Sequence, residues 1–349
     1  MQKTRGHALR NYVIRRLLLM VPTFIGITVV TFVLCQFVPG GPIDQLKLQI
    51  AGGQGGEVIT APSGESAQLN IPEEQLRVLE EYYGFDKPIP LRYLSWLWNL
   101  VRLDLGTSFR YTIPVIEIIK TRLPVSLFYG IITTLFTYVV CIPLGMVKAI
   151  RHRKPTDNLT SILIFVGYAI PGYALGAVLL VLFAVKKDWF PLGGFTSEGF
   201  ADLGSWAKIK DIFHHAALPL VCYIIGTFAV MTMLMKNSLM ENMSQDYIRT
   251  AFAKGLREKR VVWLHAIRNS VIPIAANFGH IIGLIIAGSY LIEKVFNIDG
   301  FGKMGFQAIL DRDYPITLGF LVIVVVLRLV GNILSDITLA TVDPRIRFK

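Results

Sequence analysis

Six long stretches of hydrophobic residues divide this chain. A helix needs about 20 apolar residues to cross the hydrocarbon core of a bilayer, and each stretch is long enough to do so. A backbone polar group left unpaired in hydrocarbon costs several kcal/mol, so we expect these stretches to be helical. We therefore predict an all-α membrane protein with six transmembrane helices, at residues 17–38, 125–147, 159–185, 216–235, 271–292 and 316–341.

The composition supports a membrane protein. Of the 349 residues, 53% are hydrophobic and only 17% are charged, whereas about a quarter of a typical soluble domain is charged. The first apolar stretch follows several arginines but is longer than the core of a signal peptide and lacks a small-residue cleavage site. We interpret it as a retained helix. The cysteines all fall within apolar stretches, so we expect them to pack in the core rather than form disulfides or bind metal.

The distribution of charge predicts the orientation. Lys and Arg far outnumber Asp and Glu in the N-terminal tail (1–16), near 148–158, in 236–270 and in the C-terminal tail (342–349), whereas acidic residues predominate in the alternate segments. Basic residues mark cytoplasmic loops, so both termini and 236–270 are predicted to be cytoplasmic and 39–122 extracytoplasmic. Basic residues shared among membrane-flanking loops are not typical of nucleic-acid binding, and we expect lipid but no nucleic acid as a partner.

The outer segment 39–122 contains three different patterns. Residues 51–67 are rich in Gly and Ser and are expected to be flexible, and residues 72–83 have the pattern of a short amphipathic helix. The aromatic-rich part that follows contains Trp96 and Trp98, which favour the headgroup region of a bilayer. A lid packed on the other helices explains this part equally well.

Motifs for catalysis are missing from the sequence. There is no phosphate-binding G-x-x-x-x-G-K-[ST] loop, no H-E-x-x-H and no G-x-S-x-G, and the adjacent His214 and His215 lack further metal ligands. The chain is therefore not expected to be an enzyme or to hold a cofactor or metal. Arg328 and Asp336 fall inside the last apolar stretch, where a functional role and snorkelling to the interface both remain open.

The segment 244–269 has the pattern of two short helices joined by a turn. Ser244 is predicted to cap the first helix, and Gly255 to end it in the left-handed conformation. The second helix, over 257–269, carries Val261, Leu264 and Ile267 on one face. The first helix is expected to expose the small residues Thr250, Ala251 and Ala253, which would let another protein approach its backbone closely.

The residue order in this segment resembles the coupling loop of ABC importer permeases of the oligopeptide/dipeptide branch. The resemblance is carried by Arg249-Thr250-Ala251, Gly255, HAIRN at 265–269 and Pro273. It extends along nearly the whole chain through FVPGGPIDQ, YGFDKP, DLGTS, DRDYP and VDPRIRFK. The doubled glycine of PGGPIDQ and the run FVGYAIP resemble the Yej-type oligopeptide/microcin C permeases. In FNIDGFG, Asp299 stands where the family usually has Pro, and Leu339 where it often has Tyr.

The resemblance implies a permease fold with a core domain over 123–341 and a cytoplasmic coupling helix. It implies oligopeptide uptake, including peptide antibiotics such as microcin C, across a bacterial inner membrane. The implied partners are a second permease subunit, two ATP-binding subunits or a fused ATPase that hold ATP and Mg, and a periplasmic solute-binding protein. The residues implied to contact the ATPase are Arg249, Thr250, Ala251, Lys254, Gly255 and Leu256.

Several alternatives stay open at the level of sequence. The same class of importer serves nickel chelates, glutathione and oligosaccharides, and no residue of this chain identifies its solute. A secondary transporter would be expected to have intramembrane carboxylates or inverted repeats, and neither is clear in the sequence. A membrane enzyme would need a nucleophile beside a base, but Ser289 and His280 are nine positions apart, a poor geometry for direct contact.

Overall fold

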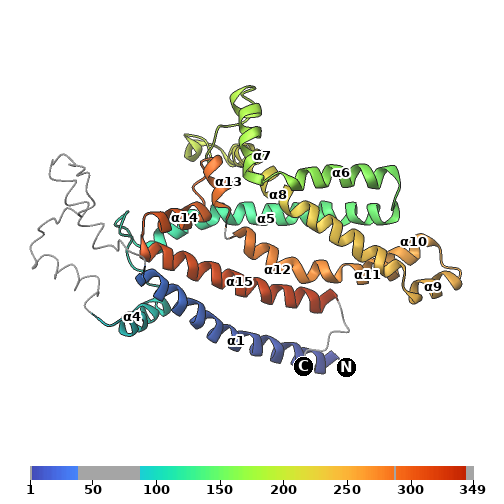
Figure 1. The fold of residues 1–349 in the computed structure, drawn as a ribbon, viewed down its shortest axis with the longest axis horizontal. Helices are drawn as coiled ribbons and strands as arrows, with labels where there is room; N and C mark the ends of the chain where they lie inside the picture. The colour runs from blue at the N-terminus through green and yellow to red at the C-terminus, as the bar shows by residue number, and fades with distance from the viewer. Residues whose placement is uncertain (1, 38–86, 287, 343–349) are drawn as a thin grey trace, which may run out of the picture. The chain divides into compact units, whose positions relative to one another are not determined.

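The computed structural model describes residues 2–37, 87–286 and 288–342, and these form helices joined by turns and by two longer segments at 102–114 and 186–204 (Figure 1). The described residues form no β-sheet, only an isolated bridge between Thr107 and Pro114. The predicted flexible stretch 51–67 and the predicted helix 72–83 lie outside the described residues. The α-helices are α1 (Gln2–Phe37), α4 (Ile89–Val101), α5 (Val115–Ile150), α6 (Pro155–Ala169), α7 (Gly172–Leu179), α8 (Ser205–Met243), α9 (Asp246–Ala253), α10 (Glu258–Val261), α11 (Ile267–Ser270), α12 (Ile272–Ile286), α13 (Tyr290–Val295), α14 (Phe301–Leu310) and α15 (Tyr314–Val342).

Within the described residues, four helices are long and apolar enough to cross a membrane. One candidate span is the part Ile14–Gln36 of α1. The other three are the whole helices α5, α8 and α15. A fifth candidate is the pair formed by α6 and the helix Gly172–Val185, which is bent by 92° at its break. The prediction of apolar spanning helices is therefore confirmed for these parts of the chain. The stretch 271–292 is divided between α12 and α13.

The bend after α6 has a local cause. Ile170 precedes Pro171, and a residue before proline disfavours the helical conformation; the backbone of Ile170 is accordingly extended. After the bend, α7 packs closely on α8 through glycine. A Cβ atom on Gly172 would lie 2.8 Å from the carbonyl oxygen of Cys222, so only glycine permits this approach.

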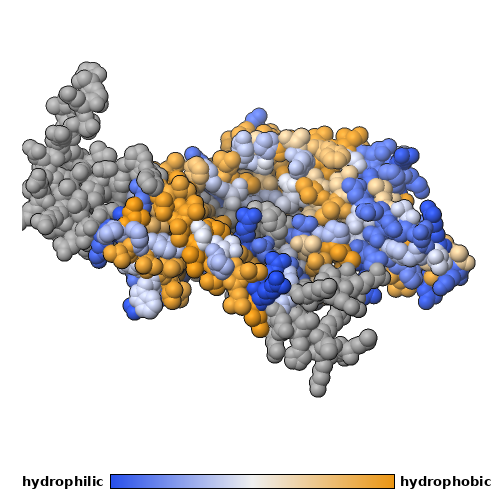
Figure 2. Space-filling view, turned by 60° about the horizontal axis from the view of Figure 1, so that its bottom comes forward, coloured by the Kyte–Doolittle hydropathy of each residue, from blue (hydrophilic) through white to orange (hydrophobic). Residues whose placement is uncertain are grey.

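The chain divides into two compact units, each of which takes residues from distant parts of the sequence. The first unit comprises residues 1–20, 121–304 and 324–349. Its core is a continuous hydrophobic cluster that includes Met235 and Leu239 of α8 and Ile274 of α12. In this unit hydrophilic residues gather at the end that carries α9, α10 and the α5–α6 turn (Figure 2). Such a division fits helices that leave the bilayer at that end.

The second unit comprises residues 21–120 and 305–323. In it, α4 packs Tyr93 and Trp96 against Phe32 of α1, with ring centroids 5.5 Å and 5.8 Å away. The opposite side of α4 exposes Leu94 and Trp98. The aromatic-rich part thus packs one face on α1, and Trp98 stays on its exposed face.

Two motifs far apart in the sequence meet in the second unit. The buried carboxylate of Asp313, in DRDYP, accepts hydrogen bonds from Ser108 Oγ at 2.5 Å and from the backbone N–H of Arg110. Ser108 ends the motif DLGTS, and Arg110 also forms an ion pair with Asp311. These contacts fasten the loop before α5 to the turn before α15.

Close packing of α12 on α15 gives a first prediction. A Cβ atom on Gly279 would lie 2.5 Å from the carbonyl carbon of Gly331, and backbone cannot rotate away as a side chain can. Gly279→Ala should therefore lower the thermal stability of the purified protein, since overpacking costs about 1–3 kcal/mol. Gly226→Ala is the matched control, because a Cβ atom there would meet no atom within 4 Å. Equal melting temperatures for the two variants would contradict this account.

Candidate functional site

The predicted coupling segment folds into a short helix, α9, set between the end of α8 and α10. One side of α9 is anchored, because Ile248 and Ala251 are buried in the hydrophobic core of the first unit. The other side exposes Arg249 and Thr250. Ala251 was expected to be exposed, and that expectation is wrong. Its Cβ faces the core because it lies three residues after Ile248, which is nearly one helical turn.

The turn after α9 has the predicted left-handed residue. Gly255 has a φ of +77°, which is accessible to glycine at no steric cost. Its N–H donates to the carbonyl of Phe252, and the N–H of Leu256 donates to that of Ala251, so carbonyls at the helix end are paired. A Cβ atom on Gly255 would meet no atom within 4 Å. Gly255 and Lys254 therefore form an open surface, while Leu256 packs partly against the core.

The start of α9 differs from the prediction. Ser244 does not cap this helix; it ends α8, and its hydroxyl donates to the carbonyl of Glu241. The residue before α9 is Gln245, and its side chain makes no capping hydrogen bond. The prediction failed because α8 continues as a helix to Met243, well beyond its apolar part.

Tyr247 links the two ends of the coupling segment. Its hydroxyl donates to Asn242 Oδ1 of α8 at 2.8 Å and accepts from Asn269 Nδ2 of α11 at 3.1 Å. Sequence reasoning missed this bridge, because its members lie 5 and 22 positions apart. The bridge holds α9 between the helix that enters the segment and the helix that leaves it.

The second arm contains a π-helical turn, Val262–Ala266, between α10 and α11. The wider turn changes which residues face the core: Val261, Val262 and Ala266 are buried, while Leu264 is 57% exposed. The prediction that Val261, Leu264 and Ile267 share one apolar face is therefore wrong for Leu264. It assumed an unbroken α-helix with 3.6 residues per turn.

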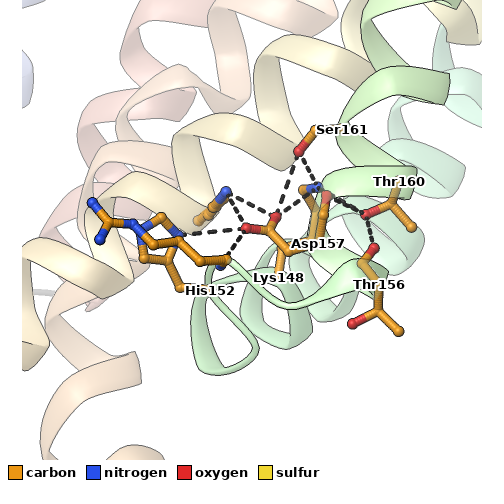
Figure 3. Close-up of polar contacts among 8 residues, drawn as sticks. Lys148, His152, Thr156, Asp157, Thr160 and Ser161 are labelled. Carbon is orange, nitrogen blue, oxygen red and sulfur yellow. Dashed lines mark hydrogen bonds and ion pairs between the residues drawn. The ribbon is translucent and has the colours of Figure 1, made fainter.

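A buried cluster of charges lies near the same end of the first unit (Figure 3). Asp157, at the start of α6, is 3% exposed and forms ion pairs with Lys148 of α5 at 3.0 Å and Lys236 of α8 at 2.8 Å. The ammonium of Lys148 also donates to Thr160 Oγ1 and Ser161 Oγ. The second carboxylate oxygen of Asp157 accepts from the backbone N–H of Arg153. Every polar atom of this carboxylate is thus paired.

This cluster joins three helices through one carboxylate. Charges taken out of water are costly unless they are paired and hydrogen-bonded, so the cluster is stable only while α5, α6 and α8 keep their relative positions. Lys236 is seven residues before the end of α8, which leads directly into α9. A displacement of α9 is therefore expected to move these helix ends together.

A second polar cluster fixes the segment between α12 and α14. The carboxylate of Glu293, fully buried in α13, accepts from Ser126 Oγ at 3.0 Å, from the Tyr223 hydroxyl and from the backbone N–H of Lys303. A Cβ atom on Gly300 would lie 2.6 Å from both carboxylate oxygens, so FNIDGFG needs its first glycine.

Asp299, which the resemblance places where Pro is expected, is paired with two basic side chains. Its carboxylate lies 2.7 Å from Arg122 and 3.2 Å from Lys303. Partial burial by itself raises the pKa of Asp299, but the hydrogen bond and charge of Arg122, with Lys303, hold that pKa below its ordinary value. The ion pair with Arg122 joins the FNIDGFG loop to α5. A proline at position 299 could not make this contact, because it has no charged side chain.

His214 and His215 each place one ring nitrogen within hydrogen-bond distance of a backbone carbonyl. Its Nε2 lies 2.9 Å from the carbonyl oxygen of Trp189, and His215 Nδ1 lies 3.0 Å from that of Asp211. Within the described residues no group of three or more His, Cys, Asp or Glu side chains is arranged to hold a metal ion.

Comparison with known proteins gives consistent matches. A family model described as "Binding-protein-dependent transport system inner membrane component" matches residues 141–348. The chain is 39% identical to the "Peptidoglycan transport system permease protein YejB" of Agrobacterium fabrum, over 97% of this chain and 98% of that protein. It is 40% identical to the "Inner membrane ABC transporter permease protein YejB" of Escherichia coli O157:H7, over 97% and 99%.

More distant matches agree with these. The chain is 34% identical to the "Oligopeptide transport system permease protein AppB" of Bacillus subtilis, over 97% of this chain and 99% of that protein. Among solved structures, an inward-facing form of the MetNI methionine ABC transporter matches with a TM-score of 0.51 at 14% identity, covering 65% of this chain and 97% of that chain. The latter likeness concerns the fold alone.

The Asp157 cluster gives the second prediction. Asp157→Asn removes the charge that pairs both lysines and should destabilise the protein by about 3–5 kcal/mol, because Lys148 and Lys236 stay buried. Adding Lys236→Met should recover part of this loss, since one uncompensated charge is then removed. Thermal unfolding of the purified protein measures both effects.

The matched control is Asp246→Asn. Asp246 pairs with Arg249 at 3.4 Å, but both side chains are largely exposed, and such a pair contributes about 0–1 kcal/mol. A loss for Asp157→Asn no larger than that of this control would contradict the structural role of the cluster.

Proposed function

Because the chain belongs to the family of binding-protein-dependent transport system inner membrane components, we propose that α9 is the helix through which partner ATPases drive it. The protein is a multi-pass inner-membrane permease of a peptide ABC importer, in keeping with relatives described as oligopeptide and peptidoglycan permeases. The observation that carries the proposal is α9 itself: a short helix anchored on one side and exposed on the other, at the hydrophilic end of the first unit.

The contact surface for an ATPase consists of the outward residues of α9 and its turn. Arg249, Thr250 and Lys254 are exposed, Gly255 leaves its backbone open to close approach, and Leu256 borders this surface. Ala251 contributes indirectly. Its buried methyl group packs in the core and so sets the distance between α9 and the helices beneath it. The exposed ring of Phe252 extends the surface and offers an apolar contact to the partner.

Movement of α9 reaches the membrane helices through packed contacts. Ile248 packs in the core, and the Tyr247 hydroxyl forms hydrogen bonds to α8 and α11. The ion pairs of the Asp157 cluster then connect α8 to α5 and α6. ATP-driven closure of the ATPase pair would push α9 and tilt these helix ends as one body. For such coupling, the partner must contact the inward- and outward-open states differently.

The proposed topology has six spans with both termini in the cytoplasm. The broken pair of α6 with Gly172–Val185 would supply the third span, and α12 with α13 the fifth. The basic residues near α9 and the α5–α6 turn support this orientation by the positive-inside rule.

The complete importer would contain a second permease subunit, two ATP-binding subunits or a fused ATPase with ATP and Mg, and a periplasmic solute-binding protein. Oligopeptides are the proposed solutes, with peptide antibiotics such as microcin C as a narrower candidate. The similarity to the two YejB proteins favours this choice over nickel chelates, glutathione or oligosaccharides.

Gly255 offers the sharpest test of the coupling surface. In Gly255→Trp the indole would project into open space from α9, so we expect peptide uptake and peptide-stimulated ATP hydrolysis to fall at least tenfold while membrane insertion is unchanged. Reconstituted importer in proteoliposomes measures both activities.

Gly255→Asn is the matched control, because Asn tolerates the left-handed conformation and projects less. It should retain most of the activity. Full uptake by Gly255→Trp would exclude the proposed contact, and equal loss in both variants would indicate backbone strain instead.

A further inference from the structure

The last helix, α15, has two exposed sides of opposite character. Arg328, Asn332 and Asp336 are four residues apart and lie along one side, where Arg328 and Asn332 are exposed. The other side carries a purely apolar exposed row, made up of Val326, Val330, Leu334 and Ile337. The two rows are offset by two residues, which is about 200° around a helix. The apolar row is suited to contact with lipid. The polar row on the opposite side is not, so we expect it to face another part of the protein or water.

The depth of Arg328 follows from an ion pair. Asp336 lies 3.3 Å from Arg16, which is the third residue of the candidate span Ile14–Gln36. This pair therefore marks the edge of the apolar region. Arg328 is eight residues further into α15, which is about 12 Å at 1.5 Å per residue. That depth is near the middle of a hydrocarbon core about 30 Å thick.

An arginine at this depth is not explained by snorkelling. Snorkelling serves residues near helix ends, and Arg328 is equally far from Tyr314 and Val342, the two ends of α15. A guanidinium facing lipid at mid-depth is costly, and such residues normally face a bundle interior or a water-filled cavity. The polar side of α15 is therefore covered by something other than lipid.

We propose that this side of α15 lines a water-filled solute pathway, where Arg328 binds the carboxylate of the transported peptide. The proposal rests on the function proposed above. Asp336 is already paired with Arg16, so the row carries one positive charge without a counter-charge from α15 itself. A guanidinium binds a carboxylate through two parallel hydrogen bonds. A peptide presents an ionised carboxylate at its C-terminus at neutral pH, and Asn332 adds an amide that can pair with its backbone.

The test compares two forms of one peptide in the complete importer, reconstituted in proteoliposomes with its binding protein. One form has a free C-terminal carboxylate and the other a C-terminal amide. Arg328→Gln should lower ATP-driven uptake of the free acid about tenfold or more and leave uptake of the amide nearly unchanged. Arg328→Lys should retain part of the preference for the free acid. Each variant is compared with wild type on the same peptide, so selectivity of the binding protein cancels.

A second measurement reports whether water reaches this side. Arg328→Cys and Asn332→Cys should react with a charged, water-soluble thiol reagent in the assembled importer. Val330→Cys is the matched control from the apolar row and should not react. The native Cys35, Cys141 and Cys222 are buried, and the wild-type importer gives their background.

The outcomes separate the rival explanations. An equal fall for both peptides in Arg328→Gln, with weaker assembly, would show that Arg328 pairs with an acid of the second permease subunit and would overturn the proposal. Unchanged uptake of both peptides would also overturn it, as would labelling of Val330→Cys but not Arg328→Cys. ATP-driven uptake of the amide by wild type checks the proposed function separately, since it does not require Arg328.

Discussion

A charge taken out of water has to be paired, and this constraint organises much of the structure. In the first unit the carboxylate of Asp157 meets two ammonium groups, and that contact sets the spacing of three helices. Because neither lysine has water as an alternative partner, the helix ends cannot separate without a large cost. Rigidity at these helix ends is therefore a result of electrostatics as much as of packing. The same rule makes Arg328 conspicuous, because the rest of α15 gives it no counter-charge.

Rigidity at one end of the bundle is useful only if another part can move. The bent pair of α6 and α7 and the π-helical turns Leu180–Val185 and Val262–Ala266 interrupt the regular helices. Wider turns and broken hydrogen-bond ladders are common at functional sites in membrane helices. The first unit thus combines helix ends held together by the Asp157 cluster with helices that are interrupted elsewhere along their length. Such a combination suits a permease that is driven from one side and opens on the other.

Much of the fold could be predicted from the sequence, because long apolar runs leave the chain few alternatives. The left-handed turn at Gly255 was also predictable, since glycine after a short helix is a local signal. Several features that the sequence did not predict depend on contacts between distant residues. The Asp157–Lys236 pair joins positions 79 apart, the bridge at Tyr247 reaches Asn269, and the π-helical turn that exposes Leu264 has no signature in a single sequence. Ala251 was misplaced because the inward face of an eight-residue helix is decided by the core beneath it.

The contact between Ser108 and Asp313 has a consequence for biogenesis. Its two residues are separated by 205 positions, so the loop before α5 emerges from the ribosome long before its partner is synthesised. Until then the buried serine and the backbone amide of Arg110 lack their acceptor, and the second unit lacks the later part of α14 and the start of α15. The second unit can therefore be completed only after residues 305–323 have been synthesised, which is late in translation.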